Sequence, residues 1–176
     1  MPVITIRTIL LAGTGTTAAV ALMLAPRMAA ADHRGAHCET VSGQLEEDLG
    51  GAANCPPDHP GCFIGQIHGR HIDATTQFFG TGAADTPPTS PDWFSYSGVT
   101  TYTMRDGSIT TRETGLASTV AIVDAPKDDS AASLSMEVIT SGTGAFAGAT
   151  GYLFVTGFVD DTSHVSSSVV GKICTP

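Results

Sequence analysis

The chain has 176 residues and carries 17 acidic against 8 basic side chains, a formal net charge of −9. This acidic balance argues against nucleic acid and anionic membrane surfaces as partners. The length suits one domain around a single hydrophobic core.

The N-terminal residues have the pattern of an export signal. Arg7 is the only charged residue before an apolar, small-residue segment over residues 8–26, and Ala29–Ala31 then supplies a small-residue cleavage site. We predict that residues 1–31 are a secretory signal peptide and that residues 32–176 form one exported β domain. The alternative is an uncleaved membrane anchor, because the uncharged segment is about long enough to cross a bilayer. We expect the mature protein to be extracellular or periplasmic, without membrane contact after cleavage.

All four cysteines follow the predicted cleavage site, and an even number in an exported chain favours disulfides over metal ligands. Three pairings are open. We favour Cys55 with Cys62, which closes a short proline-rich loop, and Cys38 with Cys174, which joins the first predicted strand to the last. In a closed barrel these two strands are neighbours, so the long link is geometrically natural there. A zinc site is disfavoured because the spacing includes no Cys-x-x-Cys knuckle.

Almost every periodic segment of the mature region alternates with a period of two, and Gly, Pro, Ser and Thr interrupt any stretch long enough for a helix. The pattern predicts about eight antiparallel strands, and therefore a sandwich or a barrel. The predicted strands are Glu39–Leu45, Phe63–Phe79, Phe94–Arg105, Ser108–Ala117, Val120–Asp124, Ser133–Thr140, Thr150–Val159 and Val165–Ile173.

Short polar segments connect these strands. Asp106-Gly107 is a two-residue hairpin signal, because both turn positions of such a loop need positive φ. The acidic runs Glu46-Glu47-Asp48 and Asp128-Asp129 are interpreted as solvated loop charges.

The segment Gly142–Gly151 holds four glycines and three alanines around one Phe, too little side-chain volume for ordinary core. It predicts a tight turn and a strand whose backbone curves or is closely approached, as at a barrel corner. The segment resembles the late-strand signature of allene oxide cyclase-like barrels and, more loosely, of dirigent proteins. Gly65–Gly69 and the closing Gly171–Cys174 agree with this resemblance, which covers most of residues 38–174.

The resemblance implies an all-β fold, a single antiparallel eight-stranded barrel of the calycin type with an apolar central cavity. Proteins of this type include cyclases and stereochemical guides that hold a reactive small molecule in one conformation without a redox cofactor. Such a reaction needs exclusion of water and a group that stabilises developing charge. The implied partner is an apolar small molecule, no cofactor or metal is expected, and assembly of related barrels through their outer walls suggests a homo-oligomer.

Glu113 is the first candidate catalytic residue. If Ile109 faces the core, Thr111 and Glu113 share that face, because alternate residues of a strand line one side. An inward Glu113 would be a cavity carboxylate with a raised pKa. The alternative places Glu113 at the rim or surface, as a partner of Arg112 or Arg105.

His71 and Asp73 are the second candidate, a catalytic acid–base dyad. On one extended strand they share a face with Ile67 and Gly69, and a His–Asp pair on an inward face is suited to proton transfer. The alternative is an exposed polar strand with ordinary cross-strand pairs. For substrate binding we predict the aromatic side chains of Tyr96, Tyr102 and Phe154.

Two functions follow from these expectations. The first is a secreted, cofactor-independent cyclase or isomerase for an apolar specialised-metabolite or lipid-derived molecule, which predicts a cavity with one or two buried ionisable groups. The second is a non-catalytic extracellular barrel that binds an apolar ligand or serves as a stable surface module, which predicts a dry or packed interior with every ionisable group outside. Serine hydrolase, kinase and dinucleotide-binding functions are set aside because their motifs do not occur in the sequence.

Overall fold

The computed structural model describes residues 35–51, 53–59, 61–85, 92–118, 120 and 130–176. The predicted signal peptide, residues 1–31, lies outside the described residues. Within the described part of the chain, no helix combines the length and the hydropathy needed to cross a membrane.

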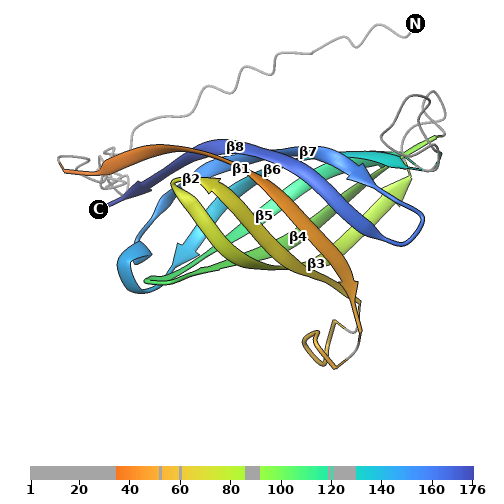
Figure 1. The fold of residues 1–176 in the computed structure, drawn as a ribbon, viewed down its shortest axis with the longest axis horizontal. Helices are drawn as coiled ribbons and strands as arrows, with labels where there is room; N and C mark the ends of the chain where they lie inside the picture. The colour runs from red at the N-terminus through yellow and green to blue at the C-terminus, as the bar shows by residue number, and fades with distance from the viewer. Residues whose placement is uncertain (1–34, 52, 60, 86–91, 119, 121–129) are drawn as a thin grey trace, which may run out of the picture. The chain divides into compact units, whose positions relative to one another are not determined.

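Eight antiparallel strands form a closed barrel in which each strand pairs with its neighbours in sequence and β1 pairs with β8 (Figure 1). This confirms the predicted all-β, eight-stranded barrel. The strands are β1 (His37–Gly50), β2 (Cys62–Arg70), β3 (Ile72–Asp85), β4 (Trp93–Met104), β5 (Gly107–Ser118), β6 (Ala131–Gly142), β7 (Thr150–Val159) and β8 (His164–Thr175).

The predicted strand Phe63–Phe79 is two strands, β2 and β3, joined by a turn at Arg70 and His71. The turn contains no Gly, Pro or Asn, and His71 instead takes a positive φ of 58°. A positive φ is uncommon outside glycine, so the sequence carries no ordinary turn signal here. The predicted strand Val120–Asp124 does not supply the eighth strand: Val120 is a bend, and residues 121–124 lie outside the described residues.

The predicted hairpin between β4 and β5 is present, but its two turn residues are one position earlier than expected. Met104 pairs with Gly107, so the loop consists of Arg105 and Asp106. The positive φ falls on Gly107, at 151°, and on neither loop residue. Gly107 is needed because its backbone is closely approached by Thr143, where a Cβ atom would meet the carbonyl oxygen.

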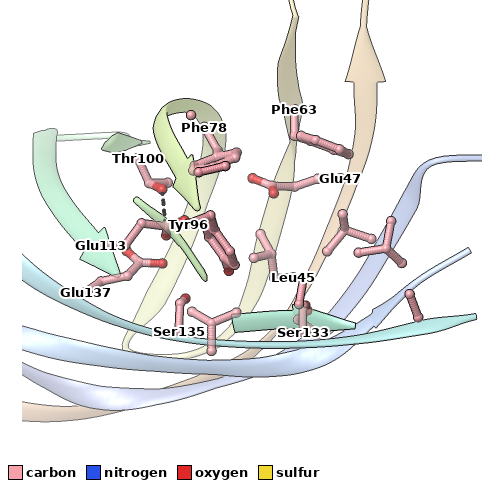
Figure 2. Close-up of a pocket in the computed structure, with 18 of the residues that line it drawn as sticks. Leu45, Glu47, Phe63, Phe78, Tyr96, Thr100, Glu113, Ser133, Ser135 and Glu137 are labelled. Carbon is pink, nitrogen blue, oxygen red and sulfur yellow. Dashed lines mark hydrogen bonds between the residues drawn. The ribbon is translucent and has the colours of Figure 1, made fainter. Parts of the chain in front are cut away.

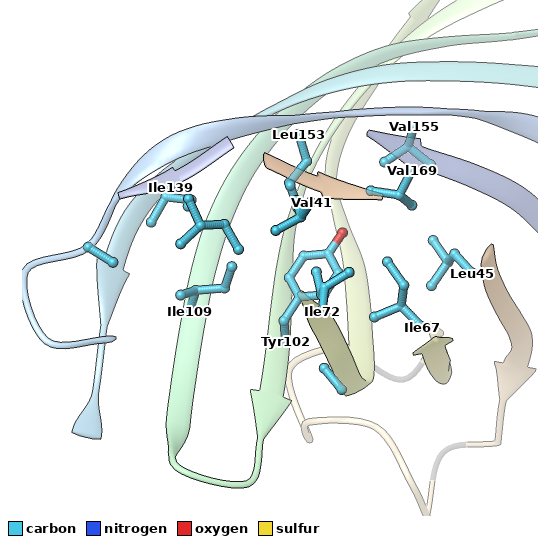
Figure 3. Packing of buried hydrophobic residues seen from close by; sticks show 13 residues of the cluster. Val41, Leu45, Ile67, Ile72, Tyr102, Ile109, Ile139, Leu153, Val155 and Val169 are labelled. Atoms are coloured by element: carbon cyan, nitrogen blue, oxygen red, sulfur yellow. The ribbon is translucent and has the colours of Figure 1, made fainter. Parts of the chain in front are cut away.

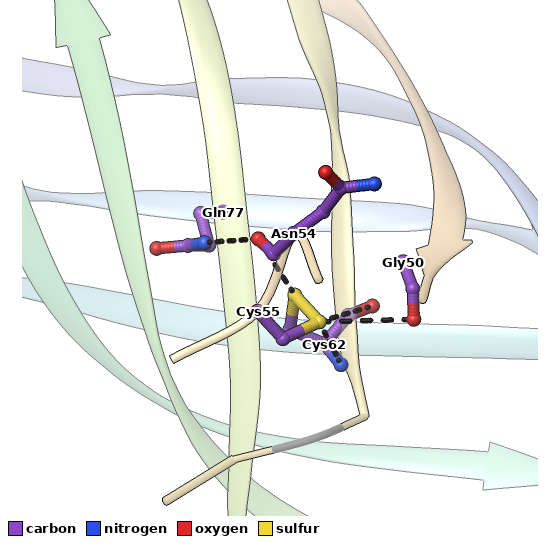
Figure 4. The surroundings of a disulfide bond; sticks show 5 residues. All are labelled: Gly50, Asn54, Cys55, Cys62 and Gln77. Carbon is purple, nitrogen blue, oxygen red and sulfur yellow. Dashed lines mark hydrogen bonds between the residues drawn. A yellow bond between two sulfur atoms is a disulfide. The ribbon is translucent and has the colours of Figure 1, made fainter. Parts of the chain in front are cut away.

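Both predicted disulfides are confirmed. Cys38–Cys174 joins residues 136 positions apart, and these two residues are direct partners in the β1–β8 register. Cys55–Cys62 closes the short loop between β1 and β2, where the Cys62 amide donates a hydrogen bond of 3.0 Å to Cys55 Sγ (Figure 4). Gln77 of β3 ties the same loop to the barrel by donating to the Asn54 carbonyl oxygen at 3.3 Å. Two disulfides fit an oxidising compartment such as the periplasm or the extracellular space.

The hydrophobic core fills one end of the barrel, where β1, β3, β5 and β7 begin (Figure 3). Inward positions alternate along each strand, and at this end they carry branched aliphatic side chains that fill a small barrel. The core side chains are Val41, Leu45, Ile67, Ile72, Ala74, Tyr102, Ile109, Ile139, Ala149, Leu153, Val155, Val169 and Ile173.

The Gly142–Gly151 segment forms the connection between β6 and β7 and covers this filled end. It contains the short 3-10 helix Gly144–Phe146, whose Phe146 packs against the core. The Thr143 amide donates to the Ser108 carbonyl at 2.8 Å, and the Ala145 amide donates to the Asp106 carbonyl at 2.9 Å. The small residues are therefore required because this connection lies directly against the β4–β5 turn.

Two glycines of this connection allow the close approach to be tested. Gly144 and Gly148 both have positive φ, 58° and 76°, but a Cβ atom on Gly144 would meet the Asp106 carbonyl, whereas one on Gly148 would meet only the Pro176 ring. We expect Gly148→Ala to lower the free energy of unfolding by about 1 kcal/mol through its backbone conformation alone. Gly144→Ala should cost roughly 1–3 kcal/mol more because of the steric conflict. Urea unfolding checks this, and equal losses would contradict the close packing.

An apolar surface covers the outward face of β5–β8. Cross-strand partners lie within it, such as Leu116 opposite Leu134 and Met136 opposite Phe154. Contiguous exposed apolar surface is uncommon in monomeric proteins. The predicted homo-oligomer stays a prediction. The exposed apolar side chains of this surface are Leu116, Leu134, Met136, Val138, Tyr152, Phe154 and Val170.

Candidate functional site

The other half of the barrel, where β1, β3, β5 and β7 end, holds a partly open cavity of about 620 Å³ (Figure 2). Small residues occupy many inward positions here, including Gly80, Gly82, Ser133, Ser135 and Ser167. These side chains are too small to meet across the barrel, so they leave a cavity here. At the other end, branched side chains fill the corresponding space.

Two carboxyl groups, Glu113 and Glu137, lie together where the cavity meets the core. They are direct partners in the β5–β6 register and are hydrogen bonded to each other. Both are buried, with 8% and 2% of their surface exposed, and both line the cavity. The pair is therefore a proton-sharing unit at the floor of the cavity.

Hydrogen bonds determine which member of the pair loses its proton first. Glu137 accepts from the Tyr102 hydroxyl at 2.9 Å and from Thr111 Oγ1 at 2.7 Å, which favours its charged form. Burial raises the pKa of Glu137 against these bonds. Burial and the nearby Glu137 charge raise the pKa of Glu113 to about 9, while a 3.3 Å bond from Thr100 opposes the shift. Glu113 is therefore the member that keeps its proton to higher pH and the proton donor of the pair.

Glu47 is a third buried carboxyl, on the opposite wall of the barrel. It is 5% exposed, and burial raises its pKa to about 7, with the Glu137 charge acting in the same direction. The nearby Thr76 hydroxyl lowers the pKa of Glu47, against the effect of burial. The two side chains are not aligned for a hydrogen bond, however, and Glu47 Oε1 and Thr76 Oγ1 have no hydrogen-bond partner. Gly65 lies between these two residues in the register and has no side chain to separate them.

Aromatic rings from β2, β3 and β4 form one wall of the cavity. Phe63 and Phe78 have ring centroids 6.1 Å apart, Phe78 and Tyr96 are 6.2 Å apart, and Tyr96 and Phe94 are 6.3 Å apart. These separations allow tilted and edge-on contacts between the rings. Together they provide a continuous apolar surface beside the three carboxyl groups (Figure 2).

Three of the residues singled out in the sequence line this cavity. Glu113 faces inward together with Ile109 and Thr111, the orientation that strand parity predicts. Tyr96 and Tyr102 also line the cavity. Burial raises the pKa of both tyrosines, so their hydroxyls stay neutral and act as hydrogen-bond donors. Catalytic and binding roles for these residues stay predictions.

The inward orientation expected for His71 and Asp73 is corrected by the structure. The turn at residues 70–71 interrupts the strand, so parity with Ile67 does not carry across it. His71 is exposed and lies 3.5 Å from a Glu39 carboxylate oxygen, while Asp73 is exposed and hydrogen bonded to His68 at 2.8 Å. No inward dyad forms.

Phe154 also differs from its expected orientation. Its side chain is 44% exposed on the outer face of β7, whereas its neighbours Leu153 and Val155 point inward. Its ring contacts Tyr152, also on the outer face. Alternation alone could not show which of two apolar sets on this strand faces the interior.

No family model matches the chain, and no curated protein or solved structure matches it either. The resemblance to allene oxide cyclase-like barrels therefore stays a prediction.

Two of the three cavity carboxyls, Glu47 and Glu137, were not singled out in the sequence. The run Glu46-Glu47-Asp48 is not a loop but the end of β1, and Glu47 shares the inward face of Val41 and Leu45. The signal that could have found it is the spacing 41, 45, 47. Glu137 likewise alternates with Ile139, but a charged residue between apolar ones is ordinarily read as the solvent face of a strand.

Outside the cavity, one histidine makes close contacts with two carboxylates. The His164 ring nitrogens lie 2.8 Å from Asp48 Oδ1 and 2.9 Å from Glu46 Oε2 on the outer face of the β1–β8 pair. The hydrogen bond with Asp48, more than any other cause, raises the pKa of His164. Among the described residues, no group of three His, Cys, Asp or Glu side chains is arranged to hold a metal ion.

Proposed function

We propose that this protein is a cofactor-independent isomerase or cyclase that takes a small, mainly apolar molecule into the barrel cavity. The single observation that carries the proposal is the hydrogen-bonded Glu113–Glu137 pair at the floor of an aromatic-lined cavity. A carboxyl group kept neutral near pH 7 is a proton donor, which is what an acid-initiated rearrangement needs.

The proposed reaction begins when Glu113 donates its proton to a substrate epoxide oxygen or double bond. The cation that forms rearranges or closes a ring, with the Glu137 carboxylate and the aromatic faces stabilising its charge. Loss of a proton from a carbon beside the cationic centre, back to the Glu113 carboxylate, gives a neutral isomer and restores the enzyme. The substrate and the product have the same formula, so no oxidant or reductant is consumed.

The resemblance of Gly142–Gly151 to allene oxide cyclase-like barrels supports the same class of reaction. Export to an oxidising compartment is part of the proposal, supported by the two disulfides and by the signal pattern in residues 1–31. The homo-oligomer is proposed on the apolar outer face of β5–β8.

A second function, non-catalytic binding of an apolar ligand, is favoured by one feature of the same site. Glu113 already gives its proton to a hydrogen bond with Glu137, and Tyr102 and Thr111 complete that network. A network in which every hydrogen bond is already made suits a purely structural role, in which it holds the wall of a binding cavity in place.

Solvent-proton exchange distinguishes these functions. Denaturing protein purified from its own host releases any bound molecule for identification, and that molecule, with a panel of terpenoid epoxides and polyenes, is then incubated with the folded protein in D₂O. We expect an isomer, with carbon-bound deuterium where a double bond was protonated, that Glu113→Gln forms about a hundredfold or more slowly. Glu39→Gln, which changes a half-buried carboxylate at the start of β1, away from the cavity, should react at the wild-type rate. A bound molecule that returns unchanged and unlabelled would support the carrier function and contradict the isomerase.

A further inference from the structure

The cavity contains acids without a matching cation. All three of its charged residues are glutamates, at positions 47, 113 and 137. The basic side chains that the structure describes are all exposed on the outside of the barrel, at Arg70, Arg105, Arg112 and Lys172. Burial of carboxyl groups is costly unless each is paired or protonated, and only Glu113 and Glu137 are hydrogen bonded to each other.

The wall around Glu47 also holds the polar atoms that lack a partner. In the described part of the chain, the buried side-chain nitrogen or oxygen atoms without a hydrogen bond are Glu47 Oε1, Thr76 Oγ1 and Ser167 Oγ. The residues are 5%, 4% and 2% exposed. Glu47 and Thr76 flank Gly65 in one row of the sheet, and Ser167 lies diagonally beside Glu47, opposite Leu45. Buried polar atoms without partners are rare, and three on one wall call for a missing group.

We propose that the wall formed by Glu47, Thr76 and Ser167 binds the ammonium group of a small amine whose apolar body lies against the aromatic rings of the cavity. The inference deepens the function proposed above and rests on it in one respect, that the cavity takes up a small molecule. An ammonium group carries hydrogen-bond donors and no acceptor, which suits a carboxylate beside two hydroxyl oxygens. The buried positive charge of the ligand supplies the counter-charge that the cavity lacks.

The aromatic wall fits the same ligand. Phe63, Phe78 and Tyr96 lie beside Glu47 in the cavity lining, and the Glu47 side chain extends from β1 towards the space between them (Figure 2). Glu47 is close enough to Tyr96 to act on it electrostatically across the cavity. Aromatic faces attract a desolvated ammonium group as well as an apolar body. A ligand with a carboxylate is disfavoured, because it would face three acids and no described base.

The binding should depend on pH through Glu47. Its carboxyl gains a proton as the pH falls below about 7, so the affinity for an amine should weaken in the same range. The neighbouring strands β2, β3 and β8 place no titratable group against it, since they contribute Gly65, Thr76 and Ser167. The titratable groups that face it across the cavity are Tyr96, Tyr102, Glu113 and Glu137.

Three ligands with one indole body test the inference by titration calorimetry at pH 8. Tryptamine carries an ammonium group, tryptophol a neutral hydroxyl and indole-3-propionate a carboxylate. We expect tryptamine to bind about tenfold or more tightly than tryptophol, and indole-3-propionate to bind weakest of the three. In Glu47→Gln the preference for tryptamine should disappear, while binding of tryptophol is retained. Glu39→Gln removes the same charge from a half-buried site at the start of β1, away from the cavity, and should keep the preference.

Equal binding of tryptamine and tryptophol would overturn the inference, as would a preference that survives in Glu47→Gln or does not weaken between pH 8 and pH 5. Failure of all three ligands to bind would overturn it as well. None of these outcomes bears on proton transfer by Glu113, because the deuterium experiment measures that step separately. Retention of tryptophol by Glu47→Gln shows that the variant is folded, so a lost preference cannot be assigned to unfolding.

Discussion

Replacing Cys38 and Cys174 together with serine is expected to lower the free energy of unfolding by about 5 kcal/mol, the largest stability effect we predict. The bond joins residues 136 positions apart and closes the β1–β8 seam of the barrel. Its loss frees almost the whole length of the barrel segment in the unfolded state, and the entropy gained grows with the length of the loop. For a domain of this size, the midpoint of thermal unfolding should fall by roughly 15 °C.

The second disulfide is the matched control for this effect. Cys55–Cys62 spans only 7 positions, so the Cys55→Ser, Cys62→Ser variant should lose about 2 kcal/mol by the same entropic relation. Urea unfolding of both double variants under identical conditions measures the difference. Losses of equal size, or a larger loss from the short loop, would mean that closure of the seam is not what stabilises the barrel.

The wild-type protein should become less stable as the pH rises from 5 to 8. Glu47 has a folded-state pKa of about 7, above the 4.5 of an exposed glutamate, because burial penalises its charged form. A pKa raised on folding means that the folded state binds the proton more tightly. Its contribution is fully present below pH 4.5 and is lost as the pH rises to 7, a change of about 3 kcal/mol. The raised pKa of Glu113 acts in the same direction up to about pH 9.

Glu47→Gln isolates the part of this dependence that belongs to Glu47. The variant cannot ionise at this position, so its stability should fall less steeply between pH 5 and pH 7, by about 1.4 kcal/mol for each pH unit. Urea unfolding at pH 5, 6, 7 and 8 measures the slope of the unfolding free energy against pH. A loss of stability caused by the amide itself is the same at every pH and does not change this slope. Glu39→Gln should retain the wild-type slope. Parallel curves for wild type and Glu47→Gln would show that Glu47 titrates normally in the folded protein.

The general class of fold could be predicted because it rests on local signals. A period of two between turn residues identifies strands wherever it occurs, and β5 was expected at 108–117 and runs over 107–118. The Cys38–Cys174 bond followed from the same expectation, since the first and last strands of a closed barrel must be neighbours. The division at residues 70–71 could not be predicted, because His71 adopts a positive φ, which is uncommon for histidine.

The candidate site was only partly predictable. Glu113 was found because it continues an apolar–polar alternation from Ile109, and the structure places it inward. Glu47 and Glu137 were missed because a glutamate in an alternating strand ordinarily faces water. Phe154 was misplaced for the complementary reason, since an apolar residue ordinarily faces the core. In β7 both faces are apolar, and the outward face joins the exposed surface of β5–β8.

The sequence by itself determined an all-β architecture of about eight strands and favoured the two disulfide pairs, because turn residues, alternation and cysteine positions act through the chain's own local geometry. Only the tertiary structure decided that Glu47, Glu113 and Glu137 meet around one cavity. Their positions are distant along the chain, and closure of the barrel brings β1, β5 and β6 around the same cavity. Burial around this cavity then raises the pKa values of all three glutamates. The local sequence around each glutamate does not indicate this burial.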